Sequence, residues 1–439
     1  MKQVRLTDTV PGTDHYDVLV CGGGPAGVGA AVAAARLGAR VLLVEMQGRL
    51  GGVVASVPYY CDAPGGPVFD ELIAKLFDIG AAELRVDRER FNPPGRYACN
   101  PGAAAQILLE MTREAGADLL LGTIAERAWL EDDAVAGALV VNKAGRSLVR
   151  ARVVVDCTAD ADLAARAGAP FLQGDAEDGR IQHGSFRWGV EGIERDRMPP
   201  AGELEALCRA AVAAGELRQP DAVFGLEPDC FPFWRESGRL WLGGWELQNV
   251  DPTDPLQTTE ALAQCQLVAL QIVRFLRARV PGCESCRMTS AGAFVARESR
   301  RIVGRYTLTR EDVLSAAKFA DGLVPAWYFT DLHDPPPGYE PHTVEYVLAN
   351  RPPEGEWYEI PYRCLLPERP AGLLVAGRCV SADRLAHGSL RVMPTCLFLG
   401  QAAGTAAARA VEAGAAPAEL DGGALKAELL AAWRPPRWA

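Results

Sequence analysis

The sequence predicts an α/β protein built around a parallel sheet that binds a nucleotide. Its first fifty residues read as a strand, a glycine-rich turn, a helix and a second strand, which is the βαβ arrangement of parallel sheets. A strand at residues 372–376 and a helix of small side chains from Leu399 onward close the chain. At about 150 residues per domain, 439 residues allow two to three domains. We therefore expect a large nucleotide-binding unit and at least one further unit.

The opening βαβ unit carries the strongest local signal. An apolar strand over residues 16–21 ends directly at Gly22, and an alanine-rich helix follows Gly27. Gly22 permits the tight turn, Gly24 lets the backbone approach a pyrophosphate, and Gly27 allows the helix to pack closely on the strand. Glu45, at the end of the second strand, is placed to accept hydrogen bonds from ribose hydroxyls. The expected contacts in this unit are Gly22, Gly24, Pro25, Ala26, Gly27, Glu45 and Met46.

Two further segments extend the predicted nucleotide site. Gly51 and Gly52 follow the acidic residue closely, and two adjacent glycines indicate a close approach of the backbone to a ligand. A strand over residues 118–122 leads to Ile124, where backbone groups are placed to hold an adenine edge. The βαβ unit alone fits NAD and FAD equally well. The run around Gly51 resembles the segment that follows the ribose-binding acid in FAD proteins of the glutathione-reductase and fumarate-reductase type, which favours FAD.

Later segments strengthen this resemblance. The resemblance rests on five pieces of sequence. They are the opening nucleotide fingerprint, Gly51-Gly52, residues 154–162, residues 297–304, and residues 374–381 together with residues 401–404. On these pieces the chain resembles the FAD-dependent oxidoreductases related to fumarate reductase flavoproteins and to the glucose-inhibited-division type tRNA-modifying flavoproteins. The pieces span nearly the whole chain. The family usually has glycine where this chain has Ala159, so a methyl group narrows the freedom of the backbone there.

The resemblance implies a Rossmann-like FAD-binding domain of the glutathione-reductase type at residues 1–165 and 364–439. It implies an inserted α+β substrate domain at residues 166–363. In the family, the N-terminus of the closing helix lies against the pyrimidine edge of the isoalloxazine, where the helix dipole stabilises the negative charge of reduced flavin. The cofactor contacts expected from these later segments are Thr158, Ala159, Gly377, Arg378, Gly400, Gln401 and Ala402.

Two histidines and one arginine are the candidates for catalysis. The flavin carries the redox step, so the protein need only bind the substrate, orient it and move a proton. His387 directly precedes the closing helix, in a segment that glycine and proline should hold as a shaped loop. His333 has carboxylates on both sides that would orient it. Arg391 offers a forked donor to a carboxylate or phosphate, with a structural salt bridge as an equal alternative.

Three further clusters leave alternatives open. The arginines of residues 297–301 either join the domains as ion pairs or hold the cofactor or an anionic substrate. The aromatic residues 327–329 form either core or a substrate platform near His333. Cys283 and Cys286 have the spacing of a redox dithiol or half a zinc site, but no second pair completes four ligands. We expect these cysteines to be structural and expect no metal.

Composition and charge exclude several classes of function. The chain has 45 basic and 56 acidic residues, a net charge of −11, and no broad basic face for nucleic acid. No apolar stretch reaches the roughly 18 residues of a membrane span, and no signal peptide is evident, so we expect a cytoplasmic protein. The twelve cysteines lack the short regular spacings of a disulfide framework. The expected partner is a small-molecule substrate, and the sequence leaves homo-oligomer formation open.

The leading hypothesis is an FAD-dependent oxidoreductase of the dehydrogenase or oxidase type. A hydride passes between a small polar organic substrate and flavin N5, while His387 or His333 handles the proton. A flavin-dependent monooxygenase ranks second, because the sequence has no second glycine fingerprint for a nicotinamide cofactor. A non-catalytic flavoprotein subunit of a larger redox complex is the third hypothesis. The substrate, the electron acceptor and covalent attachment of FAD stay open.

Overall fold

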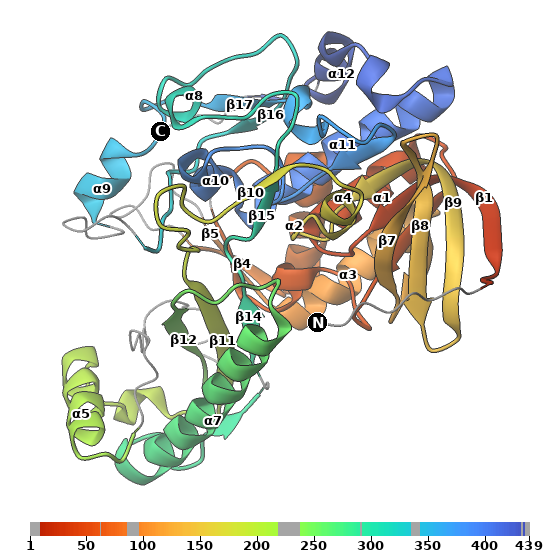
Figure 1. The fold of residues 1–439 in the computed structure, drawn as a ribbon. Helices are drawn as coiled ribbons and strands as arrows, with labels where there is room; N and C mark the ends of the chain where they lie inside the picture. Colours follow the sequence, from red (N-terminus) through yellow and green to blue (C-terminus); the bar gives the residue numbers. More distant parts are fainter. Residues whose placement is uncertain are drawn as a thin grey trace.

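A computed structural model describes residues 9–61, 63–85, 96–217, 238–289, 292–334, 343–431 and 433–434. Its centre is a seven-stranded sheet in the order β6-β2-β1-β9-β8-β7, with β18 beside the end of β9 (Figure 1). Strands β6, β2, β1, β9 and β18 are parallel, and β7 and β8 pair antiparallel. The strands are β1 (Gly12–Cys21), β2 (Val41–Glu45), β6 (Asp118–Leu121), β7 (Ile124–Glu131), β8 (Ala134–Asn142), β9 (Gly145–Asp156) and β18 (Leu373–Val375). The predicted α/β class with a parallel-dominated central sheet is confirmed.

Both faces of the parallel strands are buried, which explains why these strands read as continuous apolar runs. Along β1, Val18 and Val20 face one core, and Leu19 and Cys21 face another. Four helices contribute many side chains to the first core, together with residues of shorter helices, and the β7–β8 hairpin and one short helix contribute to the second. The four helices are α1 (Pro25–Arg36), α2 (Gly66–Asp78), α3 (Pro101–Glu114) and α11 (Met393–Ala413), and the short helix on the second face is α4 (Asp162–Arg166).

Helices α1 and α11 come from opposite ends of the chain and pack directly on each other. A Cβ atom added at Gly29 of α1 would lie 2.3 Å from the Leu397 carbonyl oxygen. One added at Gly404 of α11 would lie 2.1 Å from the Ala30 carbonyl oxygen. Both distances are shorter than any van der Waals contact, so the small side chains are what allow the backbones to approach. This contact fixes the closing helix against the helix that follows the glycine turn.

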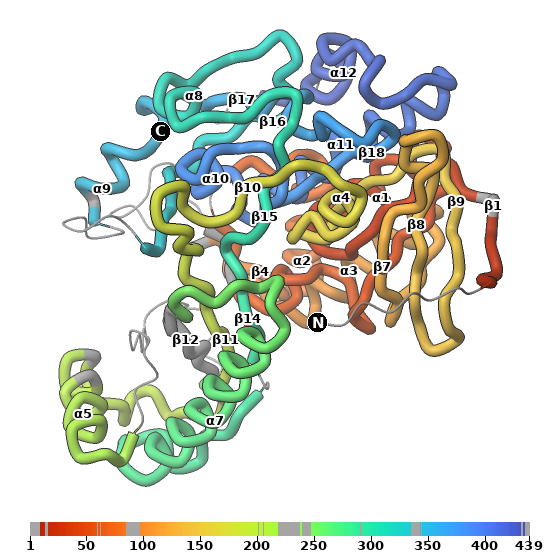
Figure 2. Tube along the Cα trace, viewed as in Figure 1, coloured from red at the N-terminus to blue at the C-terminus, as the bar shows by residue number. Residues whose placement is uncertain are grey.

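A separate hydrophobic core lies in the part of the chain that extends away from the central sheet, green in Figure 2. Its buried residues run from Phe186 to Cys286. Strand β11 is the centre of a small sheet in which β12, β13 and β14 all pair with it antiparallel. The elements here are β11 (Gly184–Glu191), η2 (Arg195–Arg197), α5 (Ala201–Ala213), β12 (Arg239–Leu247), α7 (Pro255–Arg279), β13 (Arg287–Met288) and β14 (Ala293–Val295). The strand that precedes them, β10 (Phe171–Gln173), pairs instead with β15 (Arg300–Ile302) in a sheet of two strands.

The remaining elements mostly pack with the first core. Leu308, Leu323 and Tyr358 are buried in it, although they fall within the range expected for the inserted domain. The expected division of the chain into one domain of residues 1–165 and 364–439 and a second domain of residues 166–363 stays a prediction. The two hydrophobic cores show where along the chain the packing changes from one core to the other. These elements are η1 (Gly52–Ala55), β3 (Tyr59–Tyr60), β4 (Ala82–Arg85), β5 (Arg96–Cys99), β15 (Arg300–Ile302), α8 (Arg310–Leu314), β16 (Gly322–Ala326), α9 (Val344–Ala349), β17 (Tyr358–Pro361), η3 (Tyr362–Leu365), α10 (Arg384–Leu390), η4 (Pro417–Glu419) and α12 (Gly422–Leu429).

Candidate active site

The glycine turn between β1 and α1 has the geometry that a dinucleotide site requires. Gly22 has φ +100°, and a Cβ atom there would lie 2.4 Å from the Cys157 carbonyl oxygen. A Cβ atom at Gly27 would lie 1.7 Å from the Gly22 carbonyl oxygen. At Gly24, in contrast, no protein atom lies within 4 Å of the Cβ position. Gly22 and Gly27 are thus required by packing, whereas Gly24 leaves open space in front of the N-terminus of α1.

Glu45 ends β2 beside this turn. Its carboxylate accepts the N–H groups of Gly23 and Gln47, each at 2.6 Å, and the residue is only 6% exposed. Burial raises the pKa of Glu45, and the two hydrogen bonds oppose that rise. The Thr123 N–H donates to the Glu45 carbonyl at 3.0 Å, so the start of β7 lies alongside the end of β2.

Two apolar side chains next to Glu45 are unusually exposed. Met46 is 66% exposed and Ile124 is 47% exposed. They flank the adjacent backbones of β2 and β7, where the sequence predicts the adenosine half of the cofactor. An adenine ring has apolar faces that such side chains could cover, so the exposure of these two residues fits that prediction.

The glycine pair after β2 folds back onto the turn. The Gly51 N–H donates to the Gly23 carbonyl at 2.7 Å, and Gly51 has φ +104°. A Cβ atom at Gly52 would lie 3.1 Å from Gly24 Cα. The glycine pair therefore lies against the glycine turn and borders the open space at Gly24, and its approach to a ligand stays a prediction.

A strained turn follows β9. The Asp156 carboxylate accepts from the Thr158 N–H, the Thr158 hydroxyl and the Ala164 N–H at 2.7–3.0 Å. Ala159 and Ala161 have φ of +70° and +53°, in the left-handed region that disfavours residues with a side chain. Glycine would adopt this conformation at position 159 without that strain.

Arg378 clamps the same turn. Its guanidinium donates to Asp160 Oδ1 at 2.6 Å and to the Ser299 hydroxyl at 3.0 Å. The neighbouring Gly377 has φ +98°, and a Cβ atom there would lie 3.1 Å from Ala26 Cβ. Gly377 thus lies at the N-terminus of α1, and two donors of Arg378 are used within the protein.

The closing helix begins earlier than predicted. It starts at Met393, so the expectation that it begins at Leu399 with Gly400, Gln401 and Ala402 at its N-terminus is wrong. A Cβ atom at Gly400 would lie 1.9 Å from the Ala26 carbonyl oxygen, Gln401 Oε1 accepts the Val68 N–H at 3.3 Å, and Ala402 is fully buried. These three residues pack α11 against its neighbours. The free N–H groups belong instead to its first turn, at Met393 and Thr395.

Two of the three catalytic candidates meet at one carboxylate. His333 Nε2 lies 3.2 Å from Asp331 Oδ1. Arg391 Nη2 lies 3.2 Å from Asp331 Oδ2 and donates to the Asp331 carbonyl at 2.7 Å. All three side chains are at most 12% exposed. Arg391 directly precedes the N-cap of α11, so this trio lies at the start of the closing helix.

His387 has a different environment from the one expected. It lies in helix α10 and not in a loop, because residues 384–390 form two helical turns capped by the Asp383 carboxylate. Gly388 serves a close contact, since a Cβ atom there would lie 3.2 Å from the Asp331 backbone. The His387 side chain is fully buried. Burial, followed by the charges of Arg301, Arg391 and Arg378, holds its pKa well below the usual range.

Two of the arginines of residues 297–301, Arg300 and Arg301, form ion pairs, and Arg297 donates to the His183 carbonyl at 2.6 Å. The Glu298 carboxylate is 1% exposed and binds Arg301, Arg384 Nε at 3.1 Å and the Gln182 N–H at 2.8 Å. Arg300 pairs with Asp162 at 3.1 Å. Glu298 thereby ties the segment before β11 to helix α10, close to the Asp331 trio.

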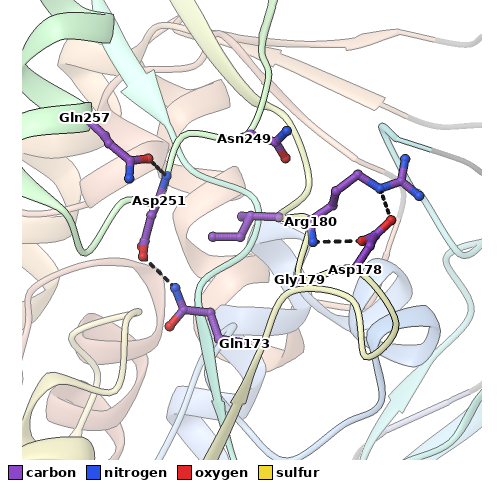
Figure 3. A pocket seen from close by; sticks show the side chains of 8 residues that line it. Gln173, Asp178, Gly179, Arg180, Asn249, Asp251 and Gln257 are labelled. Carbon is purple, nitrogen blue, oxygen red and sulfur yellow. Dashed lines mark hydrogen bonds and ion pairs between the residues drawn. The ribbon is translucent and has the colours of Figure 1, made fainter.

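An open cavity of about 460 Å³ borders this segment (Figure 3). Its polar walls are paired among themselves: Gln173 Nε2 donates to Asp251 at 2.7 Å, and Arg180 donates to Asp178. Ile181 also lines the cavity, and the next residue, Gln182, approaches Arg391 Nη2 to 3.5 Å. The cavity is therefore separated from the Asp331 trio by little more than one stretch of backbone.

The aromatic and cysteine clusters have structural roles in the described residues. Tyr328 and Phe329 are buried in a small hydrophobic cluster, with their rings 4.7 Å apart. Cys283 and Cys286 are buried free thiols, and burial raises the pKa of Cys283 to about 12.

No group of three or more potential metal-ligating side chains converges in the part of the chain that the structure covers. Likewise, none of its helices has the length and hydropathy needed to cross a membrane.

Comparison with known proteins places the chain in a family. Residues 17–429 match the family of FAD dependent oxidoreductases, and the chain belongs to this family. It is therefore an FAD-dependent flavoprotein of the oxidoreductase class, which confirms the cofactor and the family that the five pieces predicted. The match covers the two cores and every candidate residue.

Several curated proteins match parts of the chain. Digeranylgeranylglycerophospholipid reductase of Methanoculleus marisnigri is 29% identical over 35% of this chain and 42% of its own length. The tRNA uridine 5-carboxymethylaminomethyl modification enzyme MnmG of Thermus thermophilus is 32% identical over 40% of this chain and 28% of its own. CMP-5'-(3-aminopropyl)phosphonate hydroxylase of Streptomyces rubellomurinus is 35% identical over 25% and 29%. The chain thus matches less than half the length of each of these relatives.

Among solved structures, a geranylgeranyl bacteriochlorophyll reductase-like protein from Thermoplasma acidophilum is similar with a TM-score of 0.45 and 15% identity. The alignment covers 92% of this chain and 80% of that one. The fold assignment made above rests on the strand order and pairing of the central sheet.

FAD fits the residues that are present. Open space at Gly24, the N-terminus of α1 facing that space, and an acidic residue, Glu45, at the end of β2 are the features that a site for the pyrophosphate and ribose of such a cofactor requires. Sequence reasoning expected carboxylates beside His333, but it did not single out Gln182, which lies 3.5 Å from Arg391, or Thr395 in the first turn of α11. Pro394 was a usable signal for Thr395, because proline in the first turn marks the start of a helix.

Proposed function

We propose that this FAD-dependent oxidoreductase transfers a hydride between a small polar organic substrate and flavin N5, and that His333 handles the accompanying proton. The observation that carries the proposal is the Asp331 carboxylate shared by His333 and Arg391 at the start of α11. A carboxylate that fixes an imidazole ring beside a guanidinium combines an acid or base with a substrate-binding group.

The position of this trio relative to the proposed cofactor site supports the assignment. Gly400 contacts Ala26 at the phosphate end, and α11 begins seven residues earlier, at Met393. At 1.5 Å per residue, the start of α11 is about 10 Å from that contact along the helix axis. A cofactor that extends from Gly24 along α11 therefore ends near Arg391. When bound, its flavin ring supplies a hydride acceptor at N5.

His333 suits proton transfer better than His387 does. His333 lies on the segment after β16, retains some exposure and is oriented by Asp331. His387 is fully buried, and three arginines oppose its protonation. A group that must gain a proton during each turnover is disfavoured in that environment. We therefore assign the proton transfer to His333 and not to His387.

The oxidative reaction balances as follows. The substrate C–H bond breaks with its electron pair passing as hydride to the flavin, and the O–H or N–H proton of the same substrate passes to His333. Reoxidation removes two electrons from the flavin, with dioxygen or a soluble quinone as the acceptor. Anaerobic mixing with a panel of alcohols and amines tests the proposal, because a true substrate bleaches the flavin without any nicotinamide.

One observation favours a second candidate, flavin-dependent hydroxylation. A matched relative is named as a hydroxylase, at 35% identity over 128 residues. This function requires reduction of the flavin by NADH or NADPH before dioxygen reacts. Rapid bleaching by a nicotinamide alone, with no response to alcohols or amines, would select hydroxylation over the proposed dehydrogenation.

A further inference from the structure

Several buried polar atoms around Arg391 find no hydrogen-bond partner among the residues that the structure describes. They are Gln182 Nε2, Thr330 Oγ1, Arg391 Nε and Thr395 Oγ1. Gln182, Thr330 and Thr395 are at most 1% exposed. Native proteins leave few buried polar groups unpaired, because each one costs stability. Four such atoms gathered at one place therefore indicate a ligand.

These atoms come from three segments that converge on one guanidinium. Gln182 Oε1 lies 3.5 Å from Arg391 Nη2, so the Gln182 amide lies beside the guanidinium and its nitrogen is a further donor there. Thr330 precedes Asp331, whose carbonyl accepts from Arg391. Thr395 follows Arg391 by four residues, across the extended N-cap Val392, and lies in the first turn of the 21-residue helix α11. The cluster thus combines a charged donor, an amide donor, hydroxyls and a helix N-terminus.

The donor atoms of the cluster indicate which kind of ligand it binds. Arg391 has only donors and keeps its charge, so the missing partner must be an acceptor. Asp331 offers its carboxylate to Arg391 Nη2 and to His333 together, so it does not reach Arg391 Nε. A planar carboxylate matches a guanidinium edge and accepts from neighbouring amide and hydroxyl donors at the same time.

We infer that the substrate carries a carboxylate, which Arg391 binds through Nε with Gln182 Nε2 and Thr395 Oγ1 as further donors. This inference rests on the proposed function only in calling the ligand a substrate. Arg391 lies beside Asp331 and His333, so a carboxylate held there places the adjoining carbon near the proton-handling group. Arg391 thus has both of the roles that the sequence left open, because it forms a salt bridge with Asp331 and binds the substrate carboxylate.

Calorimetric titration of the holoprotein tests the inference without turnover. The probes are butyrate, benzoate and succinate, each compared with its neutral amide, and inorganic phosphate. We expect at least one carboxylate to bind at least tenfold more tightly than its amide and than phosphate. Arg391→Gln should weaken that carboxylate at least tenfold and leave the amide unchanged, as expected for loss of one charged hydrogen bond.

Two further variants keep the test decisive. Thr395→Val removes one donor with little change in shape and should weaken carboxylate binding several-fold even if Arg391→Gln fails to fold. Arg409→Gln is the matched control, because Arg409 lies on the same helix α11 but pairs with Glu428 at the surface. Equal binding of carboxylates and amides, tighter binding of phosphate, or full affinity in both Arg391→Gln and Thr395→Val would overturn the inference.

The two proposals fail in different ways. A protein that binds carboxylates but is bleached by no organic donor contradicts the hydride transfer and leaves the carboxylate site standing. A protein that uncharged donors bleach as fast as carboxylated ones, with no carboxylate affinity, contradicts the site and leaves the hydride transfer standing.

Discussion

The Asp331 carboxylate lies 3.2 Å from His333 Nε2, and the same group holds Arg391. Residues 331 and 333 follow β16, whereas Arg391 follows α10, so the trio forms only in the folded chain. The trio places His333, which can transfer a proton, beside Arg391, which can bind an anion. The proposed chemistry depends on this arrangement.

Replacing His333 by Gln should lower kcat by about 10²–10³-fold, the usual contribution of a positioned acid or base. FAD content and the thermal midpoint should stay close to wild type, because Gln is similar in size to His and retains a side-chain nitrogen that can donate to Asp331. Stopped-flow bleaching of the flavin by its substrate measures the change. Arg409→Gln serves as the control for a distant ion pair. Undiminished turnover in His333→Gln would remove this residue from the mechanism.

Gly24→Val should abolish FAD binding without unfolding the protein. No protein atom lies within 4 Å of the Gly24 Cβ position, and its φ of −69° suits any residue, so only a ligand would meet the new side chain. Flavin absorbance after gel filtration and a circular dichroism melt measure the two properties separately. Gly202→Val is a matched control, since Gly202 also has open space around it but lies in α5. Retained FAD in Gly24→Val would contradict the assigned phosphate site.

Ala159→Gly should stabilise the protein. Ala159 has φ +70°, and left-handed backbone costs a residue with a side chain about 1–2 kcal/mol relative to glycine. The free energy of unfolding should rise by about 1 kcal/mol. Ala103→Gly, in the first turn of helix α3, should change stability in the opposite direction by a similar amount. Chemical denaturation of the three proteins checks both signs.

His387 should make the fold sensitive to acid. Burial keeps its pKa well below the usual value for histidine of about 6.5, so the folded state leaves it neutral, whereas the unfolded state binds a proton below that pH. Its contribution is fully present above pH 6.5 and is lost as the pH falls. Between about pH 7.5 and about pH 5.5, wild type should lose about 1.4 kcal/mol more than His387→Gln. Parallel urea titrations at the two pH values measure the difference. Equal losses would show that His387 is protonated in the fold.

Gly400→Ala should act through packing. The added methyl group would lie 1.9 Å from the Ala26 carbonyl oxygen, so α1 and α11 must separate. We expect both a lower thermal midpoint and weaker FAD binding, because the N-terminus of α1 moves with Ala26. Gly414→Asn, at the C-cap of the same helix, is the control, because its left-handed conformation suits asparagine and nothing lies nearby. Loss of FAD at an unchanged midpoint would instead indicate direct contact of Gly400 with the cofactor.

Local requirements made the nucleotide site predictable. Gly22 and Gly27 are required by contacts within a single βαβ unit, and Glu45 lies at the end of its second strand, so short-range sequence contains the signal. The start of α11 was misplaced because the small residues from Gly400 onward resemble a helix start, although Pro394 marks the true first turn.

The substrate end of the site was less predictable. Gly388 reads as a loop residue, yet its lack of a side chain allows helix α10 to approach the Asp331 backbone. Asp331 contacts Arg391 although the two residues are 60 positions apart in the sequence. Gln182 contacts Arg391 from 209 positions away. Neither pairing has a local pattern in the sequence, because long-range packing brings the segments together. The burial of His387 likewise follows from tertiary contacts.

Anaerobic titration of the purified flavoprotein with alcohol and amine donors, with and without a carboxylate group, tests the central claim most directly. The proposed hydride transfer predicts that the flavin band bleaches with a carboxylated donor in the absence of any nicotinamide, and that His333→Gln slows the bleaching at unchanged FAD content. A flavin that responds only to NADH or NADPH, at the same rate in both proteins, would contradict it.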